Sequence, residues 1–439
     1  MSAVSTVSSS HVPPRASHAA WLATLLLLAA INMRTAVTSV GPLLDVLERR
    51  IGLSSAMAGV LTTLPVLAFA GLGAITPRFA RRFGEARTLA VALGVMTMGV
   101  ALRSVVNSAW LFLALSVPAL AGGAMGNIVL PVLVKRHFPR RIGPLTAAYT
   151  TVMAIGTTLA AGLTVPIAEL PGHLDWRLGV GVWAIPAAAA TLLWLPPASG
   201  AHGVHVTSEH RTRLPIHRSG TAWALAILFA SQSIQAYVAF GWFAAYFQAA
   251  AHSSPGHAGL LVAVLSAVQI PVSLLVPVLA GRLNSQRPLV VGLVACYLAA
   301  YLGMIVSPRA GDWAWATLAG IGGGVFPLVL ALLGLRARTA AVTRTLSAFA
   351  QSIGYIVAGT GPLLVGVTHG AFHNWIGMFV MLFTALAAIL VSGWWVGVPR
   401  YVDDDLPSAY SPAISGTSPT WQPLLPASGE LRRTEGTEQ

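Results

Sequence analysis

Long apolar runs separated by short loops occupy almost the whole chain of 439 residues. A helix needs about 20 mostly apolar residues to cross the hydrocarbon core of a bilayer. Because apolar and polar residues do not alternate within the runs, helices are predicted, not β-barrel strands. The twelve expected spans are residues 19–40, 55–75, 88–107, 110–134, 144–168, 176–195, 220–247, 256–279, 288–307, 313–335, 344–368 and 374–396.

The composition excludes a soluble protein of this length. Charged residues make up 9% of the chain, against about 25% in a typical soluble domain. The net charge of +13 is spread thinly between apolar runs, which argues against nucleic-acid binding. The single cysteine, Cys296, lies inside an apolar run and can form neither an intramolecular disulfide nor a cysteine metal site. We expect a polytopic membrane protein without metal or cofactor.

Lys and Arg in the short loops predict the orientation. Positive charge concentrates on the cytoplasmic side of membrane proteins, so both termini are expected in the cytoplasm. The opposite side holds Arg49, Arg50, Arg177 and Arg309. The cytoplasmic set is Arg78, Arg81, Arg82, Arg87, Lys135, Arg136, Arg140, Arg141, Arg211, Arg213, Arg218, Arg282, Arg287, Arg336, Arg338 and Arg344.

The loop pattern divides the chain into two six-helix bundles, residues 18–195 and 220–396, joined by a central cytoplasmic linker at 196–219. Polar tails at 1–17 and 397–439 are expected to be disordered and cytoplasmic. The first run is too long for the apolar part of a signal peptide and is interpreted as a retained helix.

The two halves resemble each other in sequence. The segment AGVL at 58–61 recurs as AGLL at 258–261, and LAGGAMG at 120–126 resembles LAGIGGG at 318–324. Both copies place their arginines on the same side, so the repeats are parallel. Two parallel six-helix repeats are typical of the major facilitator fold, with a substrate site between the halves near the midplane. The glycines indicate close helix packing, either static or at a sliding contact.

Ionisable groups inside the membrane are functional candidates. None of the thirteen acidic residues lies deep in a run, so a carboxylate proton relay is not expected. Arg34 lies past the midplane, about 20 Å along the first helix from Trp21. It either binds a substrate anion or is a structural arginine held by carbonyls or by Thr38. Arg103, near the outer end of the third span, is expected to snorkel to the interface.

Several uncharged polar residues complete the predicted site. Amides and phenols can hold a polar or planar solute, but they can equally tie helices together. Gln232 and Gln235 are three residues apart on one helix face, and Gln235 falls near the repeat position of Arg34. The substrate-binding candidates are Arg34, Asn127, Tyr149, Gln232, Gln235 and Gln351.

Several motifs together resemble the cyanate/nitroimidazole (CynX/NimT) family of major facilitator transporters. They are NMRTAVTSVGPLL at 32–44, LTTLPV at 61–66, GNIVLP at 126–131, AQSIGY at 350–355 and GPLL at 361–364. The resemblance covers all twelve spans. It implies the export or uptake of small anions or nitroheterocycles across the inner membrane of bacteria.

The loop after the second span keeps part of the general facilitator pattern. Arg82-Phe83-Gly84 is retained, but Arg81 stands where an acidic residue is usual. We expect Arg81, Arg82 and Arg282 to stabilise one gate state, or else simply to set the orientation.

These observations predict a monomeric secondary or facilitative carrier of a small polar solute, working by alternating access. A multidrug or other-solute efflux carrier and a membrane sensor remain alternatives. An enzyme is not expected, because no catalytic constellation lies in the spans. Direct ATP drive is excluded, because the chain has no phosphate-binding loop of the G-x-x-x-x-G-K type.

Overall fold

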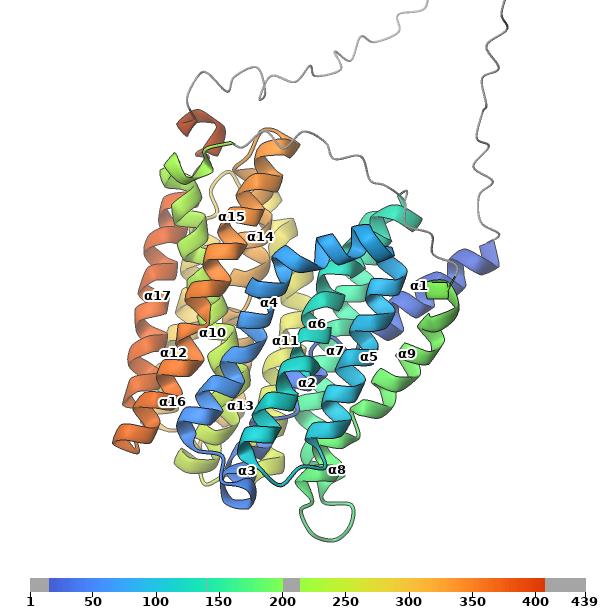
Figure 1. Ribbon diagram of the computed structural model, residues 1–439. Coiled ribbons are helices and arrows are strands. Elements are labelled where there is room, and N and C mark those ends of the chain that lie inside the picture. The colour runs from blue at the N-terminus through green and yellow to red at the C-terminus, as the bar shows by residue number, and fades with distance from the viewer. Residues whose placement is uncertain (1–15, 140, 200–213, 407–439) are drawn as a thin grey trace, which may run out of the picture.

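The computed structural model describes residues 16–139, 141–199 and 214–406, and all regular elements in these ranges are helices, as predicted (Figure 1). The first half contains α1 (Ala16–Ala30), α2 (Thr35–Thr38), η1 (Gly41–Leu43), α3 (Leu44–Ile51), α4 (Ser55–Phe83), α5 (Glu85–Arg103), α6 (Ala109–His137), α7 (Ile142–Ala168), α8 (Trp176–Gly181) and α9 (Ala184–Ser199). The second contains η2 (Ile216–Arg218), α10 (Gly220–Ala250), α11 (Pro255–Arg282), α12 (Arg287–Val306), α13 (Asp312–Gly322), α14 (Val325–Leu335), α15 (Ala340–Ala358), α16 (Thr360–Phe372), α17 (Ile376–Val396) and η3 (Val402–Asp405).

Eleven helical segments in the described ranges are long and apolar enough to cross a membrane. The second of the twelve expected spans falls on α4. The apolar residues 55–75 lie within this one helix, which runs from Ser55 to Phe83. The structure is therefore that of a multi-pass membrane protein.

The first span is interrupted, although a continuous helix over 19–40 was expected. Helix α1 ends at Ala30, residues 31–34 form turns, and α2 starts at Thr35. Polar side chains take over local carbonyl groups here: the amide of Asn32 donates to the Leu28 carbonyl at 2.8 Å, and the Thr35 hydroxyl donates to the Asn32 carbonyl at 2.9 Å. Such bonds compete with helical ones and stabilise a break. Broken helices in membranes are tolerated where they line a cavity.

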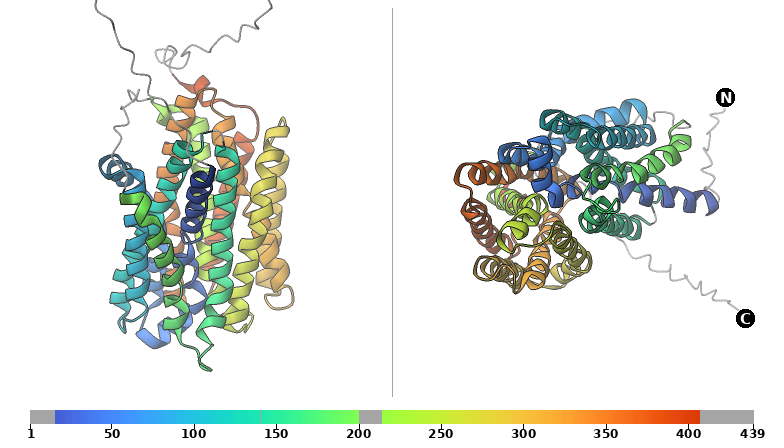
Figure 2. Two further views of the ribbon diagram at one scale, coloured as in Figure 1. Left: turned by 90° about the vertical axis from the view of Figure 1, so that its right-hand side faces the viewer. Right: turned by 90° about the horizontal axis from the view of Figure 1, so that it is seen from below.

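The helices form two groups that lie side by side (Figures 1 and 2). One contains α1–α9 with η1, and the other contains α10–α17. Helices α4 and α11 join the groups, because α4 packs on α6 and on α16, while α11 packs on α13 and on α7. The last turns of α4 and α6 and the start of α15 lie at the upper end in Figure 1. Arg81 and Arg136 belong to those last turns and Arg338 directly precedes α15, so this end is here called the arginine-rich end.

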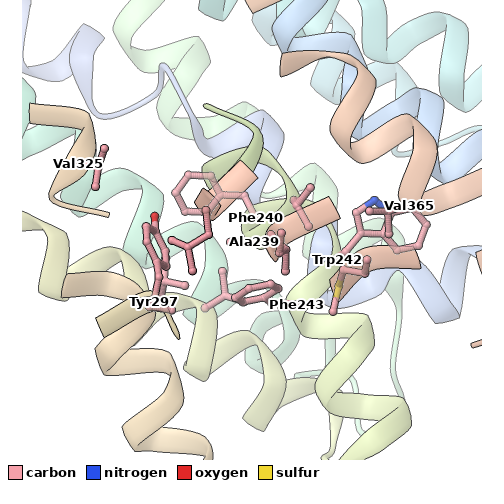
Figure 3. Close-up of a cluster of buried hydrophobic side chains, with 14 of the residues drawn as sticks. Ala239, Phe240, Trp242, Phe243, Tyr297, Val325 and Val365 are labelled. Carbon is pink, nitrogen blue, oxygen red and sulfur yellow. The ribbon is translucent and has the colours of Figure 1, made fainter. Parts of the chain in front are cut away.

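Helix α10 forms the centre of the second group. Phe240, Trp242 and Phe243 of this helix are buried, and Figure 3 shows them between Tyr297 and Val325 on one side and Val365 on the other. An α-helix that is apolar all round is expected to be enclosed by its neighbours. A second apolar cluster holds the first group together. It contains Trp183, directly before α9, and Trp194 within α9, together with residues of α1 and α5.

The expected C-terminal tail starts later than residue 397. Val402 is fully buried, its backbone N–H donates to the Arg336 carbonyl at 2.9 Å, and Asp403 accepts from the Arg338 backbone N–H at 2.9 Å. These contacts hold residues 397–406 against the start of α15, so the disorder expected for them is wrong. Residues 407–439, residues 1–15 and most of the linker (200–213) lie outside the described residues.

Candidate functional site between the two helix groups

A cavity of about 780 Å³ lies at the break in the first span. Arg34 and its neighbours on α2 form one wall, and residues of α10, α11 and α15 form the opposite one, so both helix groups contribute. The lining residues are Met33, Arg34, Ala36, Val37, Thr38, Pro65, Phe69, Ala119, Leu120, Ala124, Gln232, Ser233, Ala236, Tyr237, Phe240, Gln269, Phe326 and Tyr355.

A larger cavity of about 1520 Å³ continues from the first. The two share Arg34, Phe69, Phe326 and Tyr355. The larger one extends along α6 to Pro131 and along α15 to Ser347, each close in sequence to residues of the arginine-rich end. Its other lining residues are Asn127, Ile128, Tyr149, Thr150, Met153, Leu330, Ala348, Gln351 and Ser352.

The interface between the two helix groups is here called the seam. At the end opposite the arginine-rich end, the seam is closed by close contacts between the groups. The Cα of Gly41 approaches α10 so closely that a Cβ there would lie 2.6 Å from the Phe240 carbonyl oxygen. The Thr63 hydroxyl donates to the Gly359 carbonyl at 3.1 Å, and the Gln248 amide donates to the Pro42 carbonyl at 3.3 Å. The site is thus reached from the arginine-rich end.

Arg34 is the only charged side chain among the described residues that line these two cavities. Its guanidinium is half-buried and makes no hydrogen bond or ion pair within the described part of the chain. The Thr38 hydroxyl donates to the backbone carbonyl of Arg34 at 3.2 Å and leaves the guanidinium free. The phenols of Tyr237 and Tyr355 line the same cavity as Arg34. The arrangement provides a cation, flanked by aromatic rings, without a resident counter-ion.

The structure brings most of the other candidates to the same seam. Asn127, Tyr149 and Gln351 line the larger cavity, and Gln232 lines the smaller one. Gln232 also donates to the Tyr297 hydroxyl at 3.0 Å, so part of its amide is used inside the second group.

Gln235 is not brought to the seam. Its amide donates to the Leu382 carbonyl at 3.0 Å and accepts from the Tyr301 hydroxyl at 2.6 Å. The side chain is 1% exposed and connects α10 to α12 and α17. Gln235 therefore ties helices together, which was the alternative to substrate contact.

Sequence reasoning did not single out the aromatic pair Phe69 and Tyr355 as part of the site. Their rings stack with centroids 5.4 Å apart and an interplanar angle of 18°. The pair joins α4 of one group to α15 of the other, and both residues line both cavities. Tyr355 lies within the AQSIGY motif, which was the available signal.

Arg103 differs from its expected position. It does not snorkel but is fully buried, because its Nη2 donates to the Ala36 carbonyl oxygen at 2.9 Å and to the Ser39 hydroxyl at 3.4 Å. The guanidinium also lies over the ring of Phe112, 5.7 Å from its centroid. Helix α2 ends at Thr38 and the Val40 N–H donates to the Val37 carbonyl, so the Ala36 carbonyl has no helical partner and accepts from Arg103.

The three arginines expected at the gate lie away from the cavities at the seam. Arg82 stacks on Phe83 at 5.5 Å, Arg282 is the exposed last residue of α11, and Arg81 lines a separate cavity of about 580 Å³ with Glu85. Glu85 pairs with Arg136, which connects the start of α5 to the end of α6.

Comparison with known proteins agrees with this architecture. Residues 22–362 match the model of the Major Facilitator Superfamily. The chain is 34% identical to the 2-nitroimidazole transporter of Escherichia coli over 80% of this chain and 88% of the relative, and 29% identical to the E. coli cyanate transport protein CynX over 80% and 91%. It is 33% identical to the uncharacterized transporter YycB of Bacillus subtilis over 87% and 94%.

Solved structures show the same fold. A bacterial homologue of the human lysosomal transporter Spinster, in an inward-facing and unoccupied conformation, superposes with a TM-score of 0.72 at 16% identity, covering 90% of this chain and 99% of that one. A D-xylose–proton symporter gives 0.68 at 15% identity, covering 87% and 98%. The chain therefore belongs to the Major Facilitator Superfamily and is a multi-pass membrane transporter, not an enzyme.

Proposed function

We propose that this transporter moves a small anion or a planar nitroheterocycle through the seam by alternating access. The lone guanidinium of Arg34 carries the proposal. Taking a cation out of water is costly unless an anion or several hydrogen bonds compensate, and this one has neither in the described part of the chain. A planar anion can satisfy the fork of an arginine with two parallel hydrogen bonds.

The rest of the lining suits a small planar solute. Phe69, Phe326 and Tyr355 offer ring faces, while Asn127 and Gln351 offer amide groups. Ring stacking favours flat molecules, and a few polar groups in an apolar pocket fix their orientation. The names of two curated relatives, transporters of 2-nitroimidazole and of cyanate, support both solute classes.

In the proposed topology the arginine-rich end and both termini lie in the cytoplasm. The protein is proposed to be a monomer in the inner membrane of a bacterium. The topology rests on the positive-inside rule. The described conformation is then inward-open. Arg81, Arg82 and Arg282 lie outside the two cavities, at the helix ends of the arginine-rich side, and would meet new partners when that end closes.

Uptake into proteoliposomes tests the proposal. Purified protein would be screened by thermal shift against cyanate, nitrite, small carboxylates and nitroimidazoles, since a ligand that binds the native state raises its melting temperature. Positive compounds would then be assayed for transport with the wild type and with Arg34→Gln. Arg177→Gln is the matched control, because Arg177 is bound to Asn107 away from both cavities. Anion transport that is equal in all three proteins would overturn the assignment of Arg34.

A further inference from the structure

A second buried arginine faces the seam on the other side of α2. Arg103 lines a cavity of about 330 Å³ that lies next to the central one, towards the closed end. The two cavities share Ala36, Val37, Pro65, Leu120 and Tyr237.

The charge of Arg103 is poorly compensated. The side chain is 0% exposed, and its Nε and Nη1 atoms are buried without a hydrogen-bond partner. Nη2 alone is hydrogen-bonded, to an uncharged carbonyl and a hydroxyl, and the guanidinium otherwise lies over the uncharged ring of Phe112. Within the described ranges, no carboxylate pairs with it. A desolvated cation left in this state strongly favours the arrival of an anion.

The walls of this cavity are the contacts that close the seam. Gly41 and Thr62 come from the first group, and Tyr237 and Gly241 come from the second. A Cβ on Gly241 would lie 2.7 Å from the Thr62 side chain, so the two walls touch. Separation of the groups at this end would open the cavity and expose the guanidinium to the compartment beyond.

We propose that Arg103 forms a second site for a small monovalent anion, occupied when the end opposite the arginine-rich end opens. The solute would then pass between Arg103 and Arg34 across α2. In the closed state the anion is absent and the Ala36 carbonyl holds the side chain. This inference rests on the proposed anion transport, but it assigns a separate residue and a separate state.

A reporter cysteine can monitor this cavity. Val40 lines the Arg103 cavity but neither of the cavities that contain Arg34. Val40→Cys would be made in a Cys296→Ser background, in full-length protein in right-side-out membrane vesicles. The measurement is the rate of labelling by a membrane-impermeant maleimide, with thiocyanate replacing gluconate at constant ionic strength. Uptake of radiolabelled thiocyanate is measured in the same vesicles.

We expect thiocyanate to slow the labelling of the reporter. Arg103→Gln should raise the half-protecting concentration by about tenfold or more, because charge-assisted hydrogen bonds are lost. Arg34→Gln should abolish uptake but retain the protection. Arg177→Gln, a matched arginine at the same end of the molecule, should change neither quantity.

Other outcomes would overturn the second site. Protection that is lost in Arg34→Gln but retained in Arg103→Gln would leave a single site at Arg34, with the proposed function intact. If the wild type takes up thiocyanate but thiocyanate does not protect the reporter, the second site is likewise rejected. If the wild type shows neither protection nor uptake, the proposed anion transport is rejected as well.

Arg103→Lys separates an anion site from a purely structural arginine and covers the case in which Arg103→Gln does not fold. The lysine keeps the charge and should retain protection at a higher thiocyanate concentration. A structural role predicts a lower melting temperature with an unchanged half-protecting concentration, and that result would reject the inference.

Discussion

Gly59 of α4 and Gly366 of α16 meet backbone to backbone across the seam. A Cβ on Gly366 would lie 2.7 Å from the Cα of Gly59 and 2.6 Å from the Ser55 carbonyl oxygen. No side chain fits between the two helices at this level. The pair belongs to different helix groups and lies on the closed side of the cavity, so the contact is made and broken if the groups rock.

Gly366→Ala is therefore expected to open this end of the seam. In a helix, alanine normally stabilises by roughly 1 kcal/mol relative to glycine, but here the added methyl group forces α4 and α16 apart. Gly370→Ala is the control, because a Cβ at Gly370 would meet the Ser55 side chain at an ordinary 3.5 Å. Maleimide labelling of Val40→Cys should become faster in Gly366→Ala and not in Gly370→Ala. Equal rates would show that the glycine contact does not limit opening.

A second prediction separates two glutamines that the sequence treats alike. Gln351 lines the larger cavity and makes no hydrogen bond within the described residues, whereas Gln235 makes two inside the second group. Gln351→Leu should raise KM for the transported solute and leave the melting temperature unchanged. Gln235→Leu should cost about 1 kcal/mol of stability and leave KM unchanged. The reverse pattern would exchange their roles.

The sequence predicted the spans well, because their length and apolarity are set by the bilayer. It also predicted Arg34, since an isolated membrane charge is conspicuous. It could not separate Gln232 from Gln235, because residues three apart on a helix differ by about 60° in direction, and α10 is apolar on all sides. That angle is enough to place one side chain at the cavity and the other in the core.

The break in the first span and the burial of Arg103 could not be predicted, because both depend on local hydrogen bonds that composition and periodicity do not reveal. Side-chain bonds of Asn32 and Thr35 to local carbonyls accompany the break in the first span. The end of α2 at Thr38 then leaves the Ala36 carbonyl to accept from Arg103. The prediction that Arg103 snorkels to the interface rested only on its place near the outer end of the third span.

The C-terminal segment provides a stability prediction. Asp403 is buried and accepts the backbone N–H of Arg338, while Asp404 forms an exposed ion pair with the Arg338 side chain. Asp403→Ala would leave a backbone donor unpaired and should cost about 1–2 kcal/mol. Asp404→Ala should cost less than about 1 kcal/mol, as expected for a surface ion pair. Denaturation of the purified protein in detergent measures both, and equal losses would contradict the assigned contacts.

A last prediction distinguishes recognition of charge from recognition of a flat ring. Phe69 stacks on Tyr355 beside Arg34, so a planar heterocycle would contact these rings and a small anion would contact mainly the guanidinium. Phe69→Leu should weaken binding of 2-nitroimidazole by up to about tenfold, since an aromatic contact contributes roughly 0.5–1.5 kcal/mol beyond burial. The same variant should leave cyanate binding unchanged, and Arg34→Lys should do the opposite.

Phe79→Leu is the matched control, because Phe79 lies on the same helix, is exposed, and contacts Phe83 away from both cavities. Thermal shift of each variant against the two compounds gives the comparison. If Phe69→Leu and Arg34→Lys weaken the binding of 2-nitroimidazole and of cyanate equally, the ring pair and the guanidinium contact one shared group of the solute. The two solute classes would then differ only in how well they fit a single mode of binding.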